Sequence, residues 1–290
     1  MGRSLRYRTP MGTLQKRLDQ LLASTDGAAR READPVAFVH RYEDPRDQEL
    51  VGLLAASLAF GNIKAVQRSV SRVLTVLGDS PSAGAAMGRD RLRRRLNGFV
   101  HRVYKGPDVA ALLHNAARLQ QEHGSLGDFF AGSLADERTL RPALSLFAAE
   151  LRGARAGRGL RHLVPDPTAG SACKRLLLYL RWMVRPADGV DLGLWPLAPS
   201  VLLIPVDTHV LRIARNLRLT DRKDASWKTA EEITAKLRRF DEKDPVKYDF
   251  AICHLGVSSA CPSERDAAKC ASCVLKPVCR HWETSSREGV

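Results

Sequence analysis

Apolar residues recur at helical spacing along nearly the whole chain. Leu14, Leu18 and Leu21 fall on one face of a helix. Comparable spacing continues over residues 50–58, 66–77, 91–104, 108–121, 138–152, 174–184, 208–217, 227–239 and 246–256. Turn sequences such as Gly78-Asp79-Ser80-Pro81 separate these stretches, and no stretch alternates apolar and polar residues as a strand does. The sequence therefore predicts an all-α fold.

The size and composition are those of a globular protein. The 290 residues can bury a substantial core, and no apolar run approaches the ~20 residues that a membrane span needs. The N-terminal stretch MGRSLRYRTPMGTLQKRL is basic and lacks the apolar segment of a signal peptide. We therefore expect a cytoplasmic protein with no membrane partner.

The net charge points to a polyanionic partner. The chain carries 46 Lys and Arg against 32 Asp and Glu, a formal charge of +14, which favours nucleic acid. The excess is concentrated in residues 88–105 (GRDRLRRRLNGFVHRVYK) and 152–162 (RGARAGRGLRH). A solvated helix face would explain such runs equally well, so charge alone leaves both interpretations open.

Lys174 is a charge at the beginning of an apolar segment. It follows a glycine-containing turn and precedes the run RLLLYL, whose helix is expected to be buried. A lysine partly removed from water has a lowered pKa and can supply a neutral amine for nucleophilic attack or Schiff-base formation. The alternative is a surface lysine that extends its head group into solvent beside Arg175.

Asp207 follows an apolar run that ends at Pro205 and Val206, and it precedes THVLRIARNL. An aspartate at this place is a good helix N-cap, because its side chain can accept from the first free backbone amides. A carboxylate held there stays ionised at neutral pH, so it could also stabilise a developing cation or accept a proton. Capping and catalysis are compatible roles.

Four cysteines close to the C-terminus predict a metal site. Cys261, Cys270, Cys273 and Cys279 read C-x8-C-x2-C-x5-C, and thiolates so close together in a reducing compartment favour metal over disulfides. A [4Fe-4S] cluster and a structural Zn²⁺ ion both suit such ligands, and the spacing does not choose between them. His281 is a spare ligand.

Taken in order, the glycine turn before Lys174, the motif Val206-Asp207-Thr208-His209-Val210 and the cysteine loop resemble one known family. They are similar to the helix-hairpin-helix DNA glycosylase superfamily, in particular endonuclease III and its iron-sulfur relatives. The resemblance covers about residues 45–279. It implies a two-lobed helical fold that binds double-stranded DNA carrying a damaged base or an abasic site, in a bacterial branch of the superfamily that is expected to be monomeric and nucleoid-associated.

The resemblance assigns a catalytic pair. Lys174 matches the family's Schiff-base lysine, which attacks C1′ of the damaged nucleotide, displaces the base and allows strand cleavage by β-elimination. Asp207 matches the family's acid, which assists the attack and stabilises the oxocarbenium-like sugar. The target base must be flipped out of the duplex, because its glycosidic carbon cannot be reached inside the helix.

The resemblance also suggests where DNA would bind. The segment LLAASLAFGNIKAV matches the helix and loop that fill the gap left by the flipped base, with Phe60 or Asn62 as the wedge. The hairpin would offer backbone amides to a phosphate, and basic side chains around the cysteines would hold other phosphates. These expected contacts are Gly170, Ser171, Ala172, Lys269, Lys276 and Arg280.

Three features depart from the endonuclease III pattern. Ala172 stands where the hairpin motif G-x-G-x-K has its second glycine, and close approach of an amide to phosphate favours glycine. The 33 positions from Lys174 to Asp207 resemble the archaeal 8-oxoguanine glycosylase branch, with an insertion at 185–195 that could shape the base pocket. The first interval of the cysteine loop is also longer than in endonuclease III.

The resulting hypothesis is a bifunctional DNA glycosylase and abasic-site lyase that acts on an oxidised base. We expect residues 1–46 to complete the second lobe, 47–184 to form a six-helix barrel, 185–260 to form the second lobe, and 261–279 to form the cluster loop. A DNA-structure-binding protein without chemistry and a monofunctional glycosylase are the alternatives. For His209, His254, Tyr179, Trp182 and Trp195, packing is the simpler expectation than a role in the site.

Overall fold

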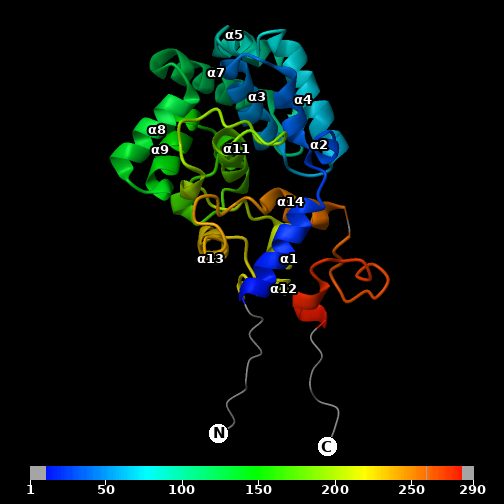
Figure 1. Ribbon diagram of the computed structural model, residues 1–290. Coiled ribbons are helices and arrows are strands. Elements are labelled where there is room, and N and C mark those ends of the chain that lie inside the picture. The colour runs from blue at the N-terminus through cyan, green and yellow to red at the C-terminus, as the bar shows by residue number, and fades with distance from the viewer. Residues whose placement is uncertain (1–10, 259, 283–290) are drawn as a thin grey trace, which may run out of the picture.

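The computed structural model describes residues 11–258 and 260–282, and in these residues the chain is predominantly helical (Figure 1). The α-helices are α1 (Met11–Ala23), α2 (Gly27–Arg31), α3 (Pro45–Leu58), α4 (Ile63–Leu77), α5 (Pro81–Ala85), α6 (Arg89–Arg95), α7 (Gly106–His123), α8 (Leu126–Glu137), α9 (Leu140–Arg152), α10 (Arg158–Leu163), α11 (Lys174–Val184), α12 (Thr208–Asn216), α13 (Trp227–Leu237) and α14 (Asp249–Val257). Short 3₁₀ turns are η1 (Pro35–Arg41), η2 (Pro167–Ala169), η3 (Pro199–Val201), η4 (Lys276–Val278) and η5 (Arg280–Trp282). The expected all-α class is confirmed.

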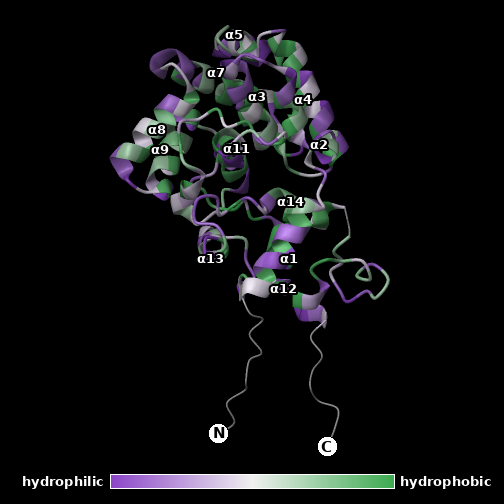
Figure 2. Ribbon diagram, in the orientation of Figure 1, coloured by the Kyte–Doolittle hydropathy of each residue, from purple (hydrophilic) through white to green (hydrophobic). Residues whose placement is uncertain are grey.

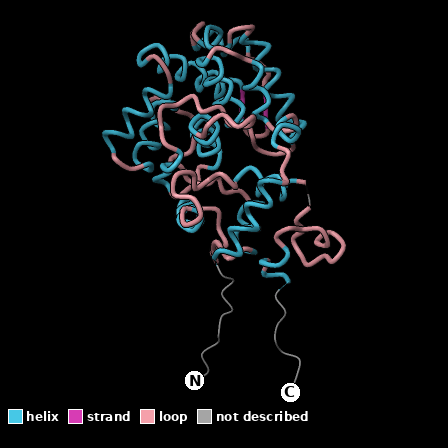
Figure 3. The backbone as a smooth tube through the Cα atoms, viewed as in Figure 1, coloured by secondary structure: helices cyan, strands magenta, loops and turns pink. Residues whose placement is uncertain are grey.

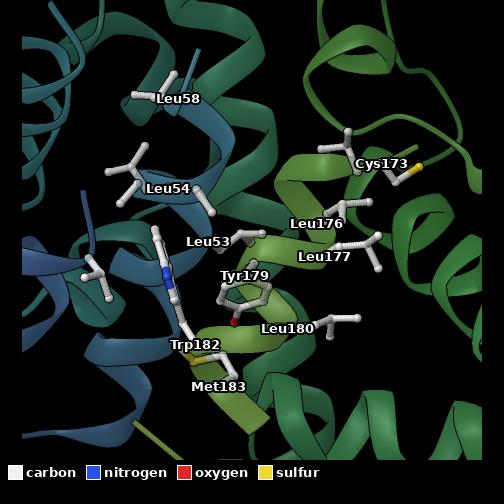
Figure 4. Close-up of a cluster of buried hydrophobic side chains, with 14 of the residues drawn as sticks. Leu53, Leu54, Leu58, Cys173, Leu176, Leu177, Tyr179, Leu180, Trp182 and Met183 are labelled. Carbon is white, nitrogen blue, oxygen red and sulfur yellow. The ribbon is translucent and has the colours of Figure 1, made fainter. Parts of the chain in front are cut away.

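Helix α11 lies at the centre of the larger group of helices, which includes α3, α4, α5, α7, α8 and α9 (Figure 1). Its residues from Leu176 to Val184 are buried except Leu178. They pack on Leu53, Leu54 and Leu58 of α3 (Figure 4). A helix that is apolar on nearly every face belongs in a core, so the run RLLLYL explains this position.

The surrounding helices are amphipathic and begin with clear caps. Asn62 caps α4, whose Val66, Val70 and Val73 are buried on one face. Ser125 caps α8 through the backbone amide of Asp128. Such caps satisfy amides that the first turn leaves free. Figure 2 shows apolar and polar residues alternating along these helices, which fits a bundle with its apolar faces turned inward.

A smaller group of helices joins residues from both ends of the described chain. Helix α1 contacts α14 and η4, and the hydroxyl of Tyr248 donates to Asp19 Oδ1 at 2.6 Å. The amide of Gln15 donates to the carbonyl of Phe240 at 3.2 Å. Residues 1–10, which begin the expected 1–46 segment, lie outside the described residues.

The insertion at 185–195 folds back onto α11. The backbone amides of Leu192 and Trp195 donate to the carbonyls of Trp182 and Met183 at 2.8 and 2.9 Å. Trp195 is 4% exposed, and its indole donates to the buried carboxylate of Glu49 at 2.8 Å. This tryptophan is therefore a packing residue, as are the buried Tyr179 and Trp182.

Several local features differ from the sequence-based expectation, among them the short helices α2, α5 and α10. The stretch 91–104, expected to be helical, stops at Arg95 and continues into an antiparallel hairpin of β1 (Val100–His101) and β2 (Tyr104–Lys105). Gly98 and Arg102 adopt left-handed backbone conformations, with φ of 68° and 54°, and these end the helix and turn the hairpin. Helix α8 was not expected at all. None of the helices in the described part of the chain is long and apolar enough to cross a membrane.

Candidate active site

Lys174 is the first residue of α11. Its side chain is partly exposed, whereas most of the helix that follows is buried. The chain enters α11 through left-handed conformations at Gly170 and Cys173, with φ of 87° and 47°. Ser171 Oγ accepts from the Cys173 amide at 3.1 Å, and Ser171 pairs with Ser226 in an isolated β-bridge. These contacts hold the turn that precedes Lys174, and so they determine where α11 begins.

Asp207 is the N-cap of α12, as expected. Its Oδ1 accepts from the backbone amides of His209 and Val210, both at 2.9 Å. The apolar run before it is buried at Leu202, Ile204 and Val206. The cap uses a single carboxylate oxygen, so Oδ2 remains available for another contact.

That second oxygen faces Lys174. The distance from Lys174 Nζ to Asp207 Oδ2 is 3.9 Å, and the two side chains are 26% and 24% exposed. The distance is that of opposite charges in contact and is too long for a hydrogen bond. Because both side chains are partly exposed, solvent reaches both groups.

Cys173, the neighbour of Lys174, is not the nucleophile of this pair. Its thiol donates to the Pro165 carbonyl at 3.6 Å, and burial raises its pKa to about 11. The thiolate, not the thiol, is reactive. Of these two neighbours, Lys174 is therefore the candidate nucleophile.

The predicted wedge residues lie on the loop between α3 and α4. Phe60 is 40% exposed, and its ring lies beneath the guanidinium groups of Arg102 at 4.6 Å and Arg175 at 5.9 Å. Asn62 is exposed, but its side chain accepts from the Lys64 amide as the cap of α4. Phe60 is thus an exposed aromatic ring flanked by cations, whereas Asn62 has a local structural role.

The hairpin residues differ in their access to solvent. Gly170 and Ser171 are exposed, while Ala172 is 6% exposed and has an ordinary negative φ. Because the backbone at position 172 needs no left-handed conformation, alanine fits there without strain. A contact to phosphate through this turn is available from Gly170 and Ser171 more directly than from Ala172.

The four cysteines all line one pocket, and residues of α12 line it as well. Burial raises the pKa of Cys261 and Cys279, and neighbouring cysteines of the set raise both further. The Arg212 guanidinium donates to the Cys261 carbonyl at 2.7 Å and ties the loop to α12. The other residues that line the pocket are mostly apolar: Ile213, Asn216, Leu217, Leu255, Ala260, Pro262, Leu275, Lys276, His281 and Trp282.

The donor set of this pocket suits iron or zinc, since thiols are the usual ligands of both. Within residues 11–258 and 260–282, no three Cys, His, Asp or Glu side chains are grouped closely enough to hold a single metal ion. Figure 3 shows the segment after α14 as mostly loop. The four predicted ligands, all of them described residues, therefore line one pocket without forming a group that would hold a single ion, on a part of the chain with little regular structure of its own.

The three basic residues of this loop have different surroundings. Lys269 is exposed. Lys276 Nζ lies 4.5 Å from the centre of the Trp282 ring, and Arg280 pairs with Asp221 at 2.6 Å. Lys269 is thus the most available to a phosphate, whereas Arg280 would have to exchange an existing partner.

The structure adds residues that the sequence reasoning missed. Arg181 of α11, the helix that begins with Lys174, forms a buried ion pair with Asp249 of α14. Arg175 packs over Phe60 and donates to the Tyr104 hydroxyl, joining the wedge loop to the helix of Lys174. The charge of Arg181 and Asp249 inside apolar runs was the available signal. The two expected histidines act in packing: His209 contacts Gly256, and His254 pairs with Asp34 at 3.3 Å.

The sequence matches the protein family described as "Protein of unknown function (DUF2400)" over residues 34–258. The chain belongs to this family. No curated protein matches the sequence. The DUF2400 match includes Lys174, Asp207 and Asp249, and it ends before the first cysteine of the C-terminal loop. The pair and its buried surroundings therefore lie within the matched residues, and the four cysteines of the C-terminal loop lie beyond them.

Proposed function

We propose that the protein is a bifunctional DNA glycosylase and abasic-site lyase of base-excision repair, with the two-lobed helix-hairpin-helix fold. The proposal is carried by one observation. Lys174 and Asp207, separated by 33 positions in the sequence, approach to 3.9 Å at a place that solvent reaches. An amine beside a carboxylate is the arrangement that Schiff-base chemistry on a sugar carbon needs.

Each residue has a defined task in this proposal. The Lys174 amine attacks C1′ of the damaged nucleotide, the C1′–N bond breaks, and the base leaves with the electron pair. Asp207 receives the proton of the lysine and stabilises the positive charge that develops on the sugar. The C1′–O4′ bond then breaks, O4′ takes up a proton, and the sugar ring opens to give the imine. Loss of a proton from C2′ allows β-elimination, in which the C3′–O bond breaks, the phosphate leaves with the electron pair and the strand is cleaved.

The surroundings of the pair are suited to a flipped nucleotide. Phe60 is an exposed ring on the α3–α4 loop and could fill the space that the base leaves in the duplex. The oxidised purine 8-oxoguanine is the favoured substrate, because the long spacing from Lys174 to Asp207 resembles that branch. The site of action would be chromosomal DNA in the cytoplasm, bound by a monomer.

The cofactor in this proposal is a [4Fe-4S] cluster held by Cys261, Cys270, Cys273 and Cys279, with structural Zn²⁺ as the alternative. The group would stabilise the fold and take no part in the reaction. Ile213 and Asn216 of α12 line the same pocket, so the group would support the helix whose other end is capped by Asp207.

Strand cleavage on a duplex with a single abasic site tests the proposal. Lys174→Ala should abolish cleavage and keep DNA binding, because the variant removes the nucleophile and leaves the basic surface. The matched control is Lys243→Ala, which removes the charge of an exposed lysine elsewhere. Cleavage by Lys174→Ala at the wild-type rate would rule out the proposed chemistry.

A DNA-binding protein without chemistry is the second candidate, supported by the net charge of +14. It predicts tight binding and no cleavage by the wild-type protein. Release of a base from 8-oxoguanine duplex with an intact backbone would instead indicate a monofunctional glycosylase.

A further inference from the structure

Exposed apolar side chains gather on two neighbouring loops of the larger group of helices. Four of the seven exposed large hydrophobic residues in the described part of the chain lie there. Phe60 and Ile63 belong to the α3–α4 loop and the start of α4, and Val100 and Val103 belong to the hairpin of β1 and β2. The loops are in contact, because the guanidinium of the exposed Arg102 lies 4.6 Å from the centre of the Phe60 ring. Exposed apolar rings interleaved with cations are typical of surfaces that stack nucleobases.

His162 joins this surface from a third element. It is an exposed residue of α10, and the centre of its ring lies 6.3 Å from that of Phe60, with the two ring planes at 63°. Arg175, the second residue of α11, donates to the backbone carbonyl of His162 and lies 5.9 Å from the centre of the Phe60 ring. Because Arg175 follows Lys174 in the chain, this surface adjoins the candidate pair.

A chain of hydrogen bonds determines which ring nitrogen of His162 carries the proton. Arg175 donates to the hydroxyl oxygen of Tyr104, since a guanidinium has donors only. The single hydroxyl proton of Tyr104 therefore goes to His162 Nδ1, at 2.9 Å. Partial burial, together with Arg175 and Arg158, lowers the pKa of His162, which favours the neutral ring. A neutral imidazole whose Nδ1 accepts has its proton on Nε2.

Buried groups hold both parts of this surface in place. Tyr104 is fully buried, so its hydroxyl has a fixed position beneath His162. His101 is 3% exposed, and its Nε2 donates to the backbone carbonyl of Phe60 at 3.2 Å. The Nδ1 of the same ring accepts from Ser69 Oγ at 2.9 Å. The loop of Phe60 and the ring of His162 are therefore both positioned before any ligand binds, which lowers the entropic cost of binding.

We infer that His162 recognises an unpaired nucleobase: its Nε2–H donates to a carbonyl oxygen or ring nitrogen of a base that stacks against Phe60. The inference deepens the proposed function and rests on it for the identity of the substrate as DNA. Every base presents such an acceptor at its edge. The contact therefore distinguishes a base from a group of the same shape that lacks the acceptor. The exposed Arg102 is available to the phosphate beside that base.

The first test measures binding to an unpaired base with a defined acceptor. Two duplexes carry the uncleavable abasic analogue tetrahydrofuran, which stands opposite thymine in one and opposite 2,4-difluorotoluene in the other. Difluorotoluene has the shape of thymine, but fluorine replaces the two carbonyl oxygens and accepts hydrogen bonds poorly. By fluorescence anisotropy, the wild-type protein should bind the thymine duplex about fivefold more tightly, the factor that one neutral hydrogen bond usually contributes.

The His162→Phe variant keeps an aromatic ring and removes the donor. It should bind both duplexes equally tightly, and it should bind the thymine duplex about fivefold more weakly than the wild type does. His123→Phe is the matched control, because His123 is an exposed histidine at the end of α7 whose ring centre lies 4.8 Å from that of Phe129. This control should keep the wild-type preference for thymine.

Stacking and hydrogen bonding can be separated with a further variant. Phe60→Ala should weaken binding to both duplexes, because thymine and difluorotoluene both offer a ring to stack. Unchanged affinity of Phe60→Ala would overturn the inference. So would a wild-type protein without preference for thymine, or a preference that persists in His162→Phe. An equal loss of affinity for both duplexes in His162→Phe would also overturn it, because the histidine would then act on the fold or on a phosphate.

A second test needs no DNA. In protein labelled with ¹⁵N-histidine, long-range ¹H–¹⁵N correlations show which ring nitrogen of His162 is protonated, and His162→Phe assigns the signals. The wild-type ring should carry its proton on Nε2 at neutral pH, and Tyr104→Phe should raise the share of the other tautomer. A wild-type ring protonated on Nδ1 would overturn the inference even if Tyr104→Phe fails to fold, because the Tyr104 hydroxyl could not donate to it.

Base recognition and strand cleavage can fail separately, because the binding test uses DNA that the protein cannot cleave. A preference for thymine that depends on His162, in a protein that does not cleave abasic DNA, would support base recognition and contradict the proposed lyase. Cleavage of abasic DNA by a wild-type protein without this preference would overturn the inference and leave the proposed function intact.

Discussion

At the scale of single residues, Asp207 divides two tasks between its two oxygens. Oδ1 accepts from two amides at 2.9 Å, and Oδ2 faces Lys174 at 3.9 Å. Because asparagine is also a good N-cap but carries no charge, substitution can separate the two tasks.

We predict that Asp207→Asn lowers abasic-site cleavage by on the order of 10²-fold or more and leaves the melting temperature nearly unchanged. Asp207→Ala should lose the cap as well, at a cost of about 1 kcal/mol in the free energy of unfolding. Cleavage rates and thermal unfolding of both variants check this. Abasic-site cleavage by Asp207→Asn at the wild-type rate would mean that the reaction does not use the negative charge of Asp207.

A second carboxylate, Asp166, is expected to make the turn before α11 sensitive to acid. It accepts from the hydroxyls of Thr168 and Ser145 and from Arg152. Although partial burial acts to raise its pKa, these hydrogen bonds prevail and lower it to about 2. Its folded pKa is depressed, so its contribution is present above the unfolded value near 4 and is lost as pH falls through about 2.

We therefore predict that Asp166→Ala is destabilised at pH 7 and that its difference from the wild type shrinks between about pH 4 and 2. Urea unfolding at pH 7, 5 and 3 measures this difference. A constant difference across the series would show that the charge of Asp166 does not contribute.

At the scale of elements, caps and periodicity were enough to predict the helices that carry Lys174 and Asp207. Helix α8 was missed although Ser125 caps it and Leu126, Phe130 and Leu134 follow a helical spacing. Its two glycines and its phenylalanine pair make the pattern weak. The hairpin at 100–105 was missed because strands of two residues give no readable alternation.

The α12–α14 contact gives a prediction at this scale. Gly256→Ala would place a Cβ 2.6 Å from the His209 Cβ and should cost about 1–3 kcal/mol while disturbing the helix that Asp207 caps. Gly132→Ala in α8 is the matched control, since nothing lies within 4 Å of its Cβ, and it should be neutral or stabilising. Equal stability of the two variants, by thermal unfolding, would contradict the close packing.

At the scale of the whole molecule, the approach of Lys174 to Asp207 is a long-range contact that no local pattern dictates. Composition and periodicity gave the helical class, and the resemblance alone suggested that the two residues meet. The buried ion pairs of Arg181 could not be assigned from the sequence, because the partners Asp191 and Asp249 come from the 185–195 insertion and from α14. Contacts between side chains on distant elements depend on how the whole core packs, so a local sequence pattern does not predict them.

The net charge predicts salt-dependent DNA binding. Arg93 and Arg94 of α6 line a groove with Lys105, and each phosphate contact releases counterions. Replacing both arginines with alanine should weaken binding at low salt and reduce the slope of log K against log salt by about 1 to 2. Alanine at the exposed Lys16 and Lys243 is the control. An unchanged slope of log K against log salt in the arginine variant would mean that Arg93 and Arg94 do not contact DNA phosphates.

The cysteine pocket gives a prediction about metal. If the proposed metal is bound, Cys270→Ser should lower bound metal and melting temperature, because Cys270 is the most buried cysteine of the four and α12 lines the same pocket. Metal analysis and visible absorption of purified protein distinguish the two groups: colour and iron indicate a cluster, and colourless protein with one zinc indicates Zn²⁺. Two results together would contradict a metal role: purified wild-type protein that contains neither metal, and a Cys270→Ser variant whose melting temperature is unchanged.

The most direct test of the central claim is borohydride trapping on duplex DNA that carries an abasic site or 8-oxoguanine. The Schiff base between Lys174 and C1′ should be reduced to a stable covalent complex, and mass spectrometry of the digested complex should find the DNA remnant on the peptide that contains Lys174. Tight binding with no covalent complex on either DNA, or a complex that persists in Lys174→Ala, would contradict the account.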